Sequence, residues 1–567
     1  MKLAGDSSPG GVPGEVLVYD TTLRDGTQRE GISLSCEDKL RIARRLDQIG
    51  VSMIEGGWPG SNPKDAELFA RARDVDWRHA RLAAFGATRR AGIAIEDDAS
   101  VAALLAAETP VCTIFGKSWT LHVREVLRAS LDENLALVGE TVAYLRAHGR
   151  RVVFDAEHFF DGHAADAPYA LEVVAAAARA GAEAVVLCDT NGGRLPWEVE
   201  GATAAVLAAL GPGGPAVGIH THDDGGCAVA NALAAVAAGA THVQGTINGY
   251  GERCGNADLC ALLPTLELKM GRRCLPPGAL PGLAELARFV AEVANLPPDE
   301  HQPYVGRCAF AHKGGVHVSA VRRCAGSYEH VAPEAVGNRT RVVVSELSGR
   351  ANLLAKAEEF GLELAGEDPG RALAEIKEGE ARGLSFEAAE ASVALLLRRR
   401  SPAYAPPFRL VEYRVMTGFQ ERLGNWAEAT IKITVGAEVI HAVAEGNGPV
   451  HALDGALRKA LWPAYPEVAD IRLTDYRVRI LDSQSATAAI TRVLIDSSDG
   501  ARRWSTVGAG TDILAASWAA LADSFEYGLT ETAEVIGRDV EREGERERER
   551  EREREPEREG ARGSAPG

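Results

Sequence analysis

Two histidines separated by one residue are the feature of this sequence that most directly indicates chemistry. His220 and His222 lie in the run V-G-I-H-T-H-D-D at 217–224. Because side chains at positions i and i+2 of a strand point to the same side, both imidazoles can reach one metal ion. The alternative is a pair of ordinary histidines that are hydrogen-bonded inside the fold. Asp223 and Asp224 could orient the rings, although one of them could instead cap the following helix.

Oxygen ligands for the same ion can come from two other parts of the chain. Asp25 follows an apolar run, and Asn256 ends the segment N-G-Y-G-E-R-C-G-N. Two histidines with two oxygen donors favour Mg²⁺, Mn²⁺, Fe²⁺, Co²⁺ or Zn²⁺ as a Lewis acid over a closed structural zinc site. Arg24 would place a permanent cation where negative charge develops on an enolate or carbonyl oxygen. A structural salt bridge between Arg24 and Glu157 is the alternative.

The elements that must position these residues repeat along the first half of the chain. From Glu15 to about Met270, short runs rich in Val, Ile and Ala alternate with longer amphipathic stretches, which is typical of βα units around a parallel sheet. Candidate strands begin at Val16, Ser52, Arg81, Val111, Arg151, Ala184, Ala216 and His242. Such a repeat over roughly 250 residues predicts a TIM barrel, with an open doubly wound sheet as the alternative.

Reactive side chains in a TIM barrel lie at the carboxyl ends of the strands, and the candidate residues fall there. Glu157 follows the fifth predicted strand, and Thr190 follows the sixth. The Thr190 hydroxyl could donate a hydrogen bond to a substrate carboxylate, or it could cap the next helix. We therefore expect one site at this end of the barrel.

Changes in composition and periodicity predict further domains. We expect a disordered leader at 1–14, the barrel at 15–275, a helical connecting subdomain at 276–400, a Pro-rich linker at 401–408, an α+β regulatory or dimerisation domain at 409–535 and a charged low-complexity tail at 536–567. The Arg-Glu repeat of the tail has no apolar face, so we attach no function to it.

Composition limits the class of protein. The 567 residues include 62 Lys and Arg against 80 Asp and Glu, and a net charge of −18 argues against binding to nucleic acid or to an anionic membrane. No apolar run approaches the roughly 20 residues that span a bilayer, and no secretory signal is recognisable, so we expect a cytoplasmic protein. Nine cysteines without a CxxC pair predict reduced thiols rather than disulfides or a cysteine-based zinc site.

Four ordered motifs resemble those of the alpha-isopropylmalate synthase and homocitrate synthase family. They are D-T-T-L-R-D-G-T-Q at 20–28 with Lys39 beyond it, V-G-I-H-T-H-D-D-G-G-C-A at 217–228, the segment at 248–256, and E-G-N-G-P-V at 445–450. Within the family, D-A-E-H-F-F-D-G at 155–162 is most similar to the citramalate synthase branch. This implies condensation of acetyl-CoA with pyruvate and thioester hydrolysis to (R)-citramalate and CoA, the first step of a route to 2-oxobutanoate and isoleucine.

The resemblance also implies roles for individual residues in the barrel. The divalent metal, Mg²⁺ or Mn²⁺ first and Zn²⁺ or Co²⁺ as alternatives, would be held by Asp25, His220, His222 and Asn256. Asp20 opens the first motif but is not a ligand. Arg24 would stabilise the oxyanion, Thr190 would bind the substrate carboxylate, and Glu157 would orient that network.

A base must remove a methyl proton from acetyl-CoA, the second substrate. By resemblance this is Glu252 together with His317, which would arrive from the connecting segment of a partner subunit, with Tyr328 accompanying it. His312 and His317 could instead be ordinary surface or interface histidines. The last domain resembles a dimeric regulatory domain, so we expect a homodimer and an end-product amino acid, isoleucine, as effector. A purely structural role in dimerisation is the alternative.

Three other functions fit part of this pattern. An isopropylmalate or homocitrate synthase would differ in the pocket for the 2-oxoacid side chain. A carbon–carbon lyase of the hydroxymethylglutaryl-CoA type shares the R-D-G and H-x-H motifs, but the region at 408–529 argues against it. A non-catalytic amino-acid sensor would not need the intact set of predicted site residues.

Overall fold

The computed structural model of this protein describes residues 14–362, 369–421 and 424–531. The predicted leader up to residue 13 and the predicted tail at 536–567 lie outside the described residues. The chain divides into two compact units. The barrel unit contains the chain up to Phe310 and, in addition, the segment Glu329–Thr340. The C-terminal unit contains Ala311–Tyr328 and the chain from Arg341 onward. The predicted domain boundaries stay predictions.

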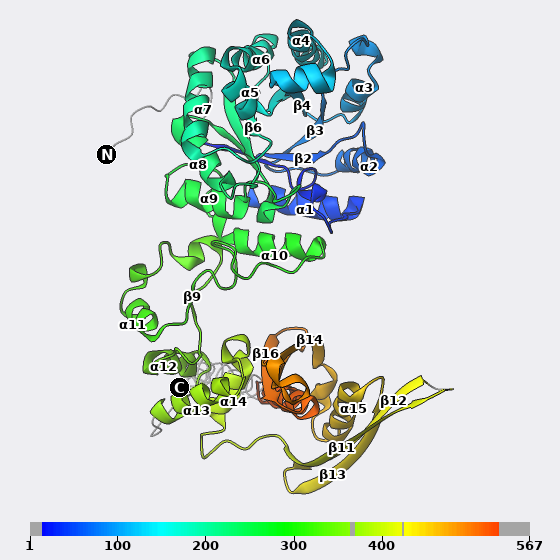
Figure 1. Ribbon diagram of the computed structural model, residues 1–567, viewed down its shortest axis with the longest axis vertical. Helices are drawn as coiled ribbons and strands as arrows, with labels where there is room; N and C mark the ends of the chain where they lie inside the picture. Colours follow the sequence, from blue (N-terminus) through cyan, green and yellow to red (C-terminus); the bar gives the residue numbers. More distant parts are fainter. Residues whose placement is uncertain (1–13, 363–368, 422–423, 532–567) are drawn as a thin grey trace, which may run out of the picture. The chain divides into compact units, whose positions relative to one another are not determined.

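Eight parallel strands close into a barrel in the order of the sequence (Figure 1). They are β1 (Leu17–Asp20), β2 (Met53–Gly57), β3 (Arg81–Ala87), β4 (Val111–Lys117), β5 (Arg151–Glu157), β6 (Ala184–Asp189), β7 (Ala216–Thr221) and β8 (His242–Gly245). The first and last strands pair in parallel from Leu17 opposite His242 to Asp20 opposite Gly245. This closure confirms the predicted TIM barrel and excludes the open sheet.

Helices surround these strands in Figure 1. They are α1 (Cys36–Ile49), α2 (Pro63–Ala72), α3 (Ala99–Ala106), α4 (Leu131–Ala147), α5 (Phe159–Ala165), α6 (Ala167–Ala180), α7 (Pro196–Leu210), α8 (Ala228–Ala238), α9 (Leu259–Leu268) and α10 (Leu283–Val293). The first shows why they form where they do. Ser35 and Asp38 make a capping box at its start, and Gly50 ends it with a φ of 93° that favours glycine.

The interior of the barrel holds a small apolar cluster that is separate from the core between strands and helices. Its buried members are Tyr19, Met53, Ala83, Val111, Val153, Ala184, Val186 and Cys188. Because side chains alternate along a strand, the residues two and four positions further on also point inward. Toward the carboxyl ends of the strands these inward positions become polar, and they include Glu55, Thr113, Asp155, His220 and Gln244. The fold therefore directs the polar residues into one mouth of the barrel.

The C-terminal unit begins with a helical part and continues as antiparallel sheets. The helical part contains α11 (Gly315–Arg323), α12 (Arg350–Glu359), α13 (Pro369–Ala381), α14 (Glu390–Arg398) and the parallel pair β9 (Ala311–His312) and β10 (Arg341–Val342). One sheet holds β11 (Arg409–Gln420), β12 (Gly424–Val435) and β13 (Glu438–Gly446), and the other holds β14 (Arg472–Ile480), β15 (Thr491–Ser498) and β16 (Arg503–Gly510).

Two helices provide the apolar partner of these sheets: α15 (Pro449–Leu461) and the helical residues 513–531. Alternate residues of β12 are buried with Leu453 and Leu457 of α15 in one core. A helical connecting part followed by an α+β domain is the predicted arrangement, and it is confirmed.

Two further expectations concern the chain as a whole. All nine cysteines are free, as predicted from the absence of paired spacing. Among the helices in the described part of the chain, none has both the length and the hydropathy that crossing a membrane requires.

Candidate active site

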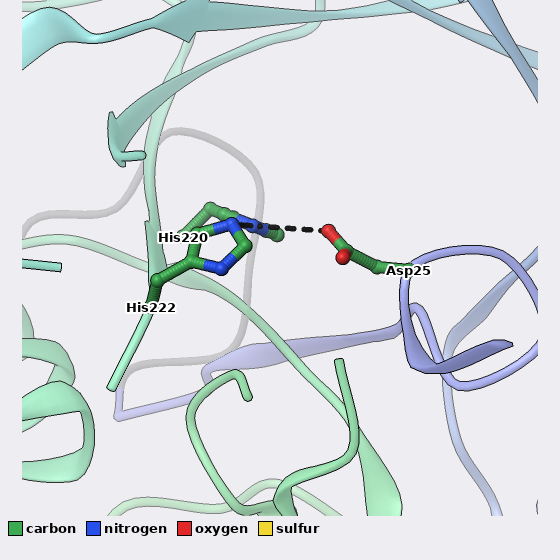
Figure 2. Close-up of side chains that lie close together, drawn as sticks. All are labelled: Asp25, His220 and His222. Atoms are coloured by element: carbon green, nitrogen blue, oxygen red, sulfur yellow. Dashed lines mark hydrogen bonds and ion pairs between the residues drawn. The ribbon is translucent and has the colours of Figure 1, made fainter. Parts of the chain in front are cut away.

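Asp25, His220 and His222 meet at the carboxyl end of the barrel (Figure 2). Asp25 lies in the turn after β1, His220 lies in β7, and His222 follows that strand directly. The Nε2 atom of His220 is 3.4 Å from Asp25 Oδ2 and 3.3 Å from His222 Nε2. All three residues are buried, and one possible ligand atom from each lies within 4.8 Å of the others. The i, i+2 spacing thus brings both imidazoles to one point beside a carboxylate.

Gln244 fixes the tautomer of His220. The Gln244 side chain donates from Nε2 to Asp155 Oδ1 at 3.0 Å, so its Oε1 faces Nδ1 of His220 at 2.9 Å. Because an amide oxygen only accepts, Nδ1 must carry a proton, which leaves Nε2, beside Asp25, as the nitrogen that can bind a metal. A histidine that binds metal through one nitrogen commonly donates from the other in this way.

The predicted metal fits this set of donors. Asp25 Oδ1 and Asn256 Oδ1 are buried and find no hydrogen-bond partner among the residues that the structure describes. The backbone of Asn256 forms an isolated antiparallel β-bridge with His222. Its side-chain Nδ2 donates to the Tyr250 carbonyl at 3.2 Å, which leaves the side-chain oxygen without a partner. Buried acceptors without a partner cost free energy, and a divalent cation with mixed nitrogen and oxygen ligands would satisfy them.

The charges of Asp25 and His222 suit metal binding, whereas at His220 burial is outweighed by Asp25, which raises the His220 pKa, so a metal competes with a proton there. Burial alone would raise the pKa of Asp25, but the Arg24 guanidinium and His220 lower it well below its usual range, so Asp25 is a carboxylate. Burial, reinforced by His220, lowers the pKa of His222 to about 4. His222 is therefore neutral at pH 7, the state in which an imidazole binds metal.

Arg24 is held by two carboxylates. Its Nε lies 2.5 Å from Glu55 Oε2, and its Nη1 lies 3.0 Å from Asp25 Oδ2. The guanidinium carbon is 3.9 Å from the centre of the Phe85 ring. Glu55 is fully buried and also accepts from the Tyr19 hydroxyl at 2.8 Å. The alternative salt bridge between Arg24 and Glu157 is therefore wrong, since Arg24 pairs with Glu55 and Asp25.

Glu157 and Thr190 lie at the ends of neighbouring strands and have other partners. Glu157 forms an ion pair with Lys117, the last residue of β4. The Thr190 hydroxyl oxygen accepts from the backbone N–H of His158 at 2.8 Å, so it holds the chain after β5 rather than capping the next helix. Its own proton stays available for a further acceptor.

Glu252 lies on the loop after β8. Its side chain is 59% exposed, with Oε2 3.4 Å from Nη1 of Arg253. The loop needs glycine at position 255, where φ is 103° and a Cβ would lie 2.0 Å from the Gly249 carbonyl oxygen. This sharp return brings Asn256 back to the histidines while Glu252 remains at the surface.

The expectation that Asp223 or Asp224 orients the imidazoles is wrong. Asp223 accepts from the backbone N–H of Ala228 at 2.9 Å, where α8 begins, and Asp224 binds Arg253 at 2.7 and 2.9 Å. Gln244 performs the orienting role instead. Sequence reasoning missed Gln244 because it lies in a short strand that is buried throughout. Its position two residues after His242, on the same face of the strand, could have indicated it.

His317 and Tyr328 belong to the C-terminal unit and lie against each other. Their rings are stacked with centres 4.2 Å apart and an angle of 28° between their planes. Tyr328 is half exposed, whereas His312 is buried in β9. That His317 and Tyr328 help to remove the acetyl-CoA proton in the active site of a partner subunit stays a prediction.

Comparison with known proteins gives matches along most of the chain. Residues 15–289 match the family model described as HMGL-like, 304–383 match the homocitrate synthase post-HMGL domain, and 387–529 match the LeuA allosteric (dimerisation) domain. An (R)-citramalate synthase of Synechocystis is 54% identical over 90% of this chain and 96% of its own. An (R)-citramalate synthase of Geobacter sulfurreducens is 51% identical over 92% of this chain and 99% of its own. A probable 2-isopropylmalate synthase of Methanopyrus kandleri is 33% identical over 89% of this chain and 97% of its own.

A closed barrel with a buried Asp/His/His cluster, followed by these two domains, defines an acetyl-CoA-dependent condensing enzyme built on an HMGL-like barrel. Enzymes with this barrel use a divalent metal, and the cluster described above is where such an ion fits. The chain belongs to the alpha-isopropylmalate synthase and homocitrate synthase family, in its citramalate synthase branch. The predicted family and branch are thus confirmed.

Proposed function

We propose that this protein condenses acetyl-CoA with pyruvate and hydrolyses the resulting thioester, releasing (R)-citramalate and CoA. The observation that carries the proposal is the buried metal-ligand cluster beside Arg24, in a chain that is 44–54% identical to several (R)-citramalate synthases over about nine-tenths of its length. The reaction would open a route from pyruvate to 2-oxobutanoate and isoleucine. Acetyl-CoA as a substrate and nine free cysteines fit a cytoplasmic enzyme.

The metal ligands in this proposal are Asp25, His220, His222 and Asn256, and the ion is Mg²⁺ or Mn²⁺, with Zn²⁺ and Co²⁺ as alternatives. When bound, a divalent cation makes the ketone of a 2-oxoacid a better electrophile. Arg24 is already fixed by Asp25 and Glu55, so its charge is in place before negative charge develops on oxygen.

Thr190 and Glu157 complete the binding of the 2-oxoacid. The Thr190 hydroxyl, whose oxygen is anchored by the His158 N–H, can turn its proton toward the substrate carboxylate. Glu157, paired with Lys117, orients this polar network from the adjacent strand end. Both residues stand at the same mouth of the barrel as the metal ligands.

Removal of the acetyl-CoA proton is assigned to Glu252 with His317. Glu252 is too exposed for efficient base catalysis in the barrel alone, because water solvates and weakens the charge interactions it would need. We infer that the connecting segment of a second copy covers it and supplies His317 together with Tyr328. The protein would accordingly be a homodimer, which the match to a dimerisation domain supports.

The effector proposed for the C-terminal domain is isoleucine, the end product of the proposed route. The match of residues 387–529 to an allosteric domain supports regulation at this place. Competition of isoleucine with other amino acids for binding, measured by calorimetry, would test the choice of effector.

Release of free CoA thiol from acetyl-CoA tests the reaction. The assay uses Mg²⁺ or Mn²⁺ with pyruvate, 2-oxobutanoate, 2-oxoisovalerate or 2-oxoglutarate in parallel, and kcat/KM ranks the substrates. We expect pyruvate to rank first, with citramalate as product. Preference for 2-oxoisovalerate would make the protein an isopropylmalate synthase with the same site. Absence of metal-dependent thiol release with every 2-oxoacid would refute the proposal.

A further inference from the structure

Lys117 is a charged residue at the barrel mouth that enters the proposed reaction only as the ion-pair partner of Glu157. It is the last residue of β4, and the alternation from Val111 through Thr113 and Phe115 points its side chain inward. It lies in register with Glu157 of β5 and forms an ion pair with it. The side chains of Lys117 and Glu157 are 15% and 23% exposed, so the pair is neither sealed in the core nor free in solvent.

Aromatic rings connect Lys117 to the described site. Its ammonium nitrogen lies 5.5 Å from the centre of the Phe115 ring, and Phe115 stacks on Phe85 at 5.4 Å. Arg24 lies over Phe85. Lys117 and Arg24 are therefore two cations on one stacked aromatic pair, and the backbone at Lys117 is held by a 2.8 Å hydrogen bond from Asn134 Nδ2 to its carbonyl oxygen.

The charges around this mouth show what Lys117 would contribute. Asp25, Glu55, Asp155 and Glu157 would carry four negative charges if all were ionised, and Arg24 is already shared by Asp25 and Glu55. Burial raises the pKa of Cys188 well above its usual value, and the charges of Asp155, Glu157, Arg24 and Asp25 also act on it, so Cys188 lies among these groups. A divalent ion, Arg24 and Lys117 together would balance these four charges. Without Lys117 the mouth would carry a net negative charge, and Glu157 would face the anionic substrate unpaired.

We propose that Lys117 is a positioning residue for the 2-oxoacid. By pairing with Glu157, it holds the Glu157 carboxylate in place and neutralises its charge beside the carboxylate of the substrate. The inference rests on the proposed function, because it takes the 2-oxoacid to bind at this mouth. Lys117 acts here through Glu157 rather than by contact with the reacting atoms.

The test measures pyruvate binding to the Mn²⁺-loaded full-length protein by calorimetry, without acetyl-CoA. Lys117→Met should weaken pyruvate binding about 10- to 100-fold, because an unpaired carboxylate repels the substrate anion across a partly desolvated mouth. Lys117→Arg, which keeps the charge, should stay within about threefold of the wild type. Lys432→Met is the matched control, since Lys432 pairs with Glu412 on the C-terminal sheet, and it should leave pyruvate binding unchanged.

The double variant Lys117→Met/Glu157→Gln separates positioning from a merely structural role. It removes both charges and leaves no unpaired carboxylate, so it should bind pyruvate more tightly than Lys117→Met, yet more weakly than the wild type because Glu157 no longer orients the binding network. Wild-type affinity in Lys117→Met would overturn the inference, and so would a double variant that binds as weakly as Lys117→Met alone. Both results are distinct from failure of the proposed function, in which the wild-type protein itself would neither bind pyruvate nor release thiol.

Discussion

Replacing Gln244 by methionine should weaken metal binding although it removes none of the proposed metal ligands. Gln244 is completely buried and accepts from His220 Nδ1 at 2.9 Å, while its amide group is fixed by the 3.0 Å hydrogen bond to Asp155. Methionine has a similar length but no strong acceptor, so the proton of His220 is no longer confined to Nδ1. In the other tautomer the proton lies on Nε2 and blocks the lone pair that faces Asp25.

The expected loss in metal affinity is about 10- to 100-fold, the usual effect of removing a group that orients a ligand. This corresponds to about 1.4 to 2.7 kcal/mol of binding free energy. Titration of metal-stripped protein with Mn²⁺ in a calorimeter measures it directly. Asn352→Leu is a suitable control, because Asn352 is equally buried and its amide donates to two backbone carbonyls in the C-terminal unit, away from the proposed ligands. A folded Gln244→Met protein that binds Mn²⁺ as tightly as the wild type would refute the tautomer argument.

Glu252→Ala should bind Mn²⁺ almost normally but slow the exchange of acetyl-CoA methyl protons in deuterated water, measured by NMR; normal exchange would reject Glu252 as part of the base. Asp47→Asn should lower the free energy of unfolding at pH 7 by about 1–3 kcal/mol, because Asp47 accepts from three backbone N–H groups at 78–80. Burial would raise the Asp47 pKa, but these hydrogen bonds lower it overall. Its contribution is therefore full above the unfolded pKa of about 4 and is lost as the pH falls through the lower folded pKa. Urea unfolding should show the difference between Asp47→Asn and the wild type shrinking below about pH 4, and a constant difference would contradict this account.

The fold was predictable because the relevant signals are local. Strands buried on both faces are near-continuous apolar runs, and each is followed by an amphipathic helix with its own boundary signals, such as Ser35 and Gly50 around α1. The same is true of His220 and His222, since a spacing of two residues on one strand already places both rings on one side. The family motifs added Asp25 and Asn256 from distant parts of the chain.

The partners of the site residues were not predictable in this way, because they are set by register between strands far apart in the sequence. Arg24 could have paired with any acidic residue at the mouth, and only the closed barrel shows that Glu55, 31 positions away, is its partner besides the adjacent Asp25. Lys117 and Glu157 are 40 positions apart and meet through strand pairing. Gln244 and Asp155 lie in buried strands, where a polar residue is easily taken for an ordinary core position.

The most direct test of the central claim compares metal content and pyruvate-dependent thiol release in the same preparations of wild type and His220→Ala. If Asp25, His220, His222 and Asn256 hold the ion that the reaction needs, the wild type will bind close to one Mn²⁺ per chain and release CoA thiol with pyruvate. The variant will stay folded, bind Mn²⁺ at least about 100-fold more weakly and release no thiol above background. A His220→Ala protein with wild-type Mn²⁺ affinity and full activity would contradict the assignment of the site.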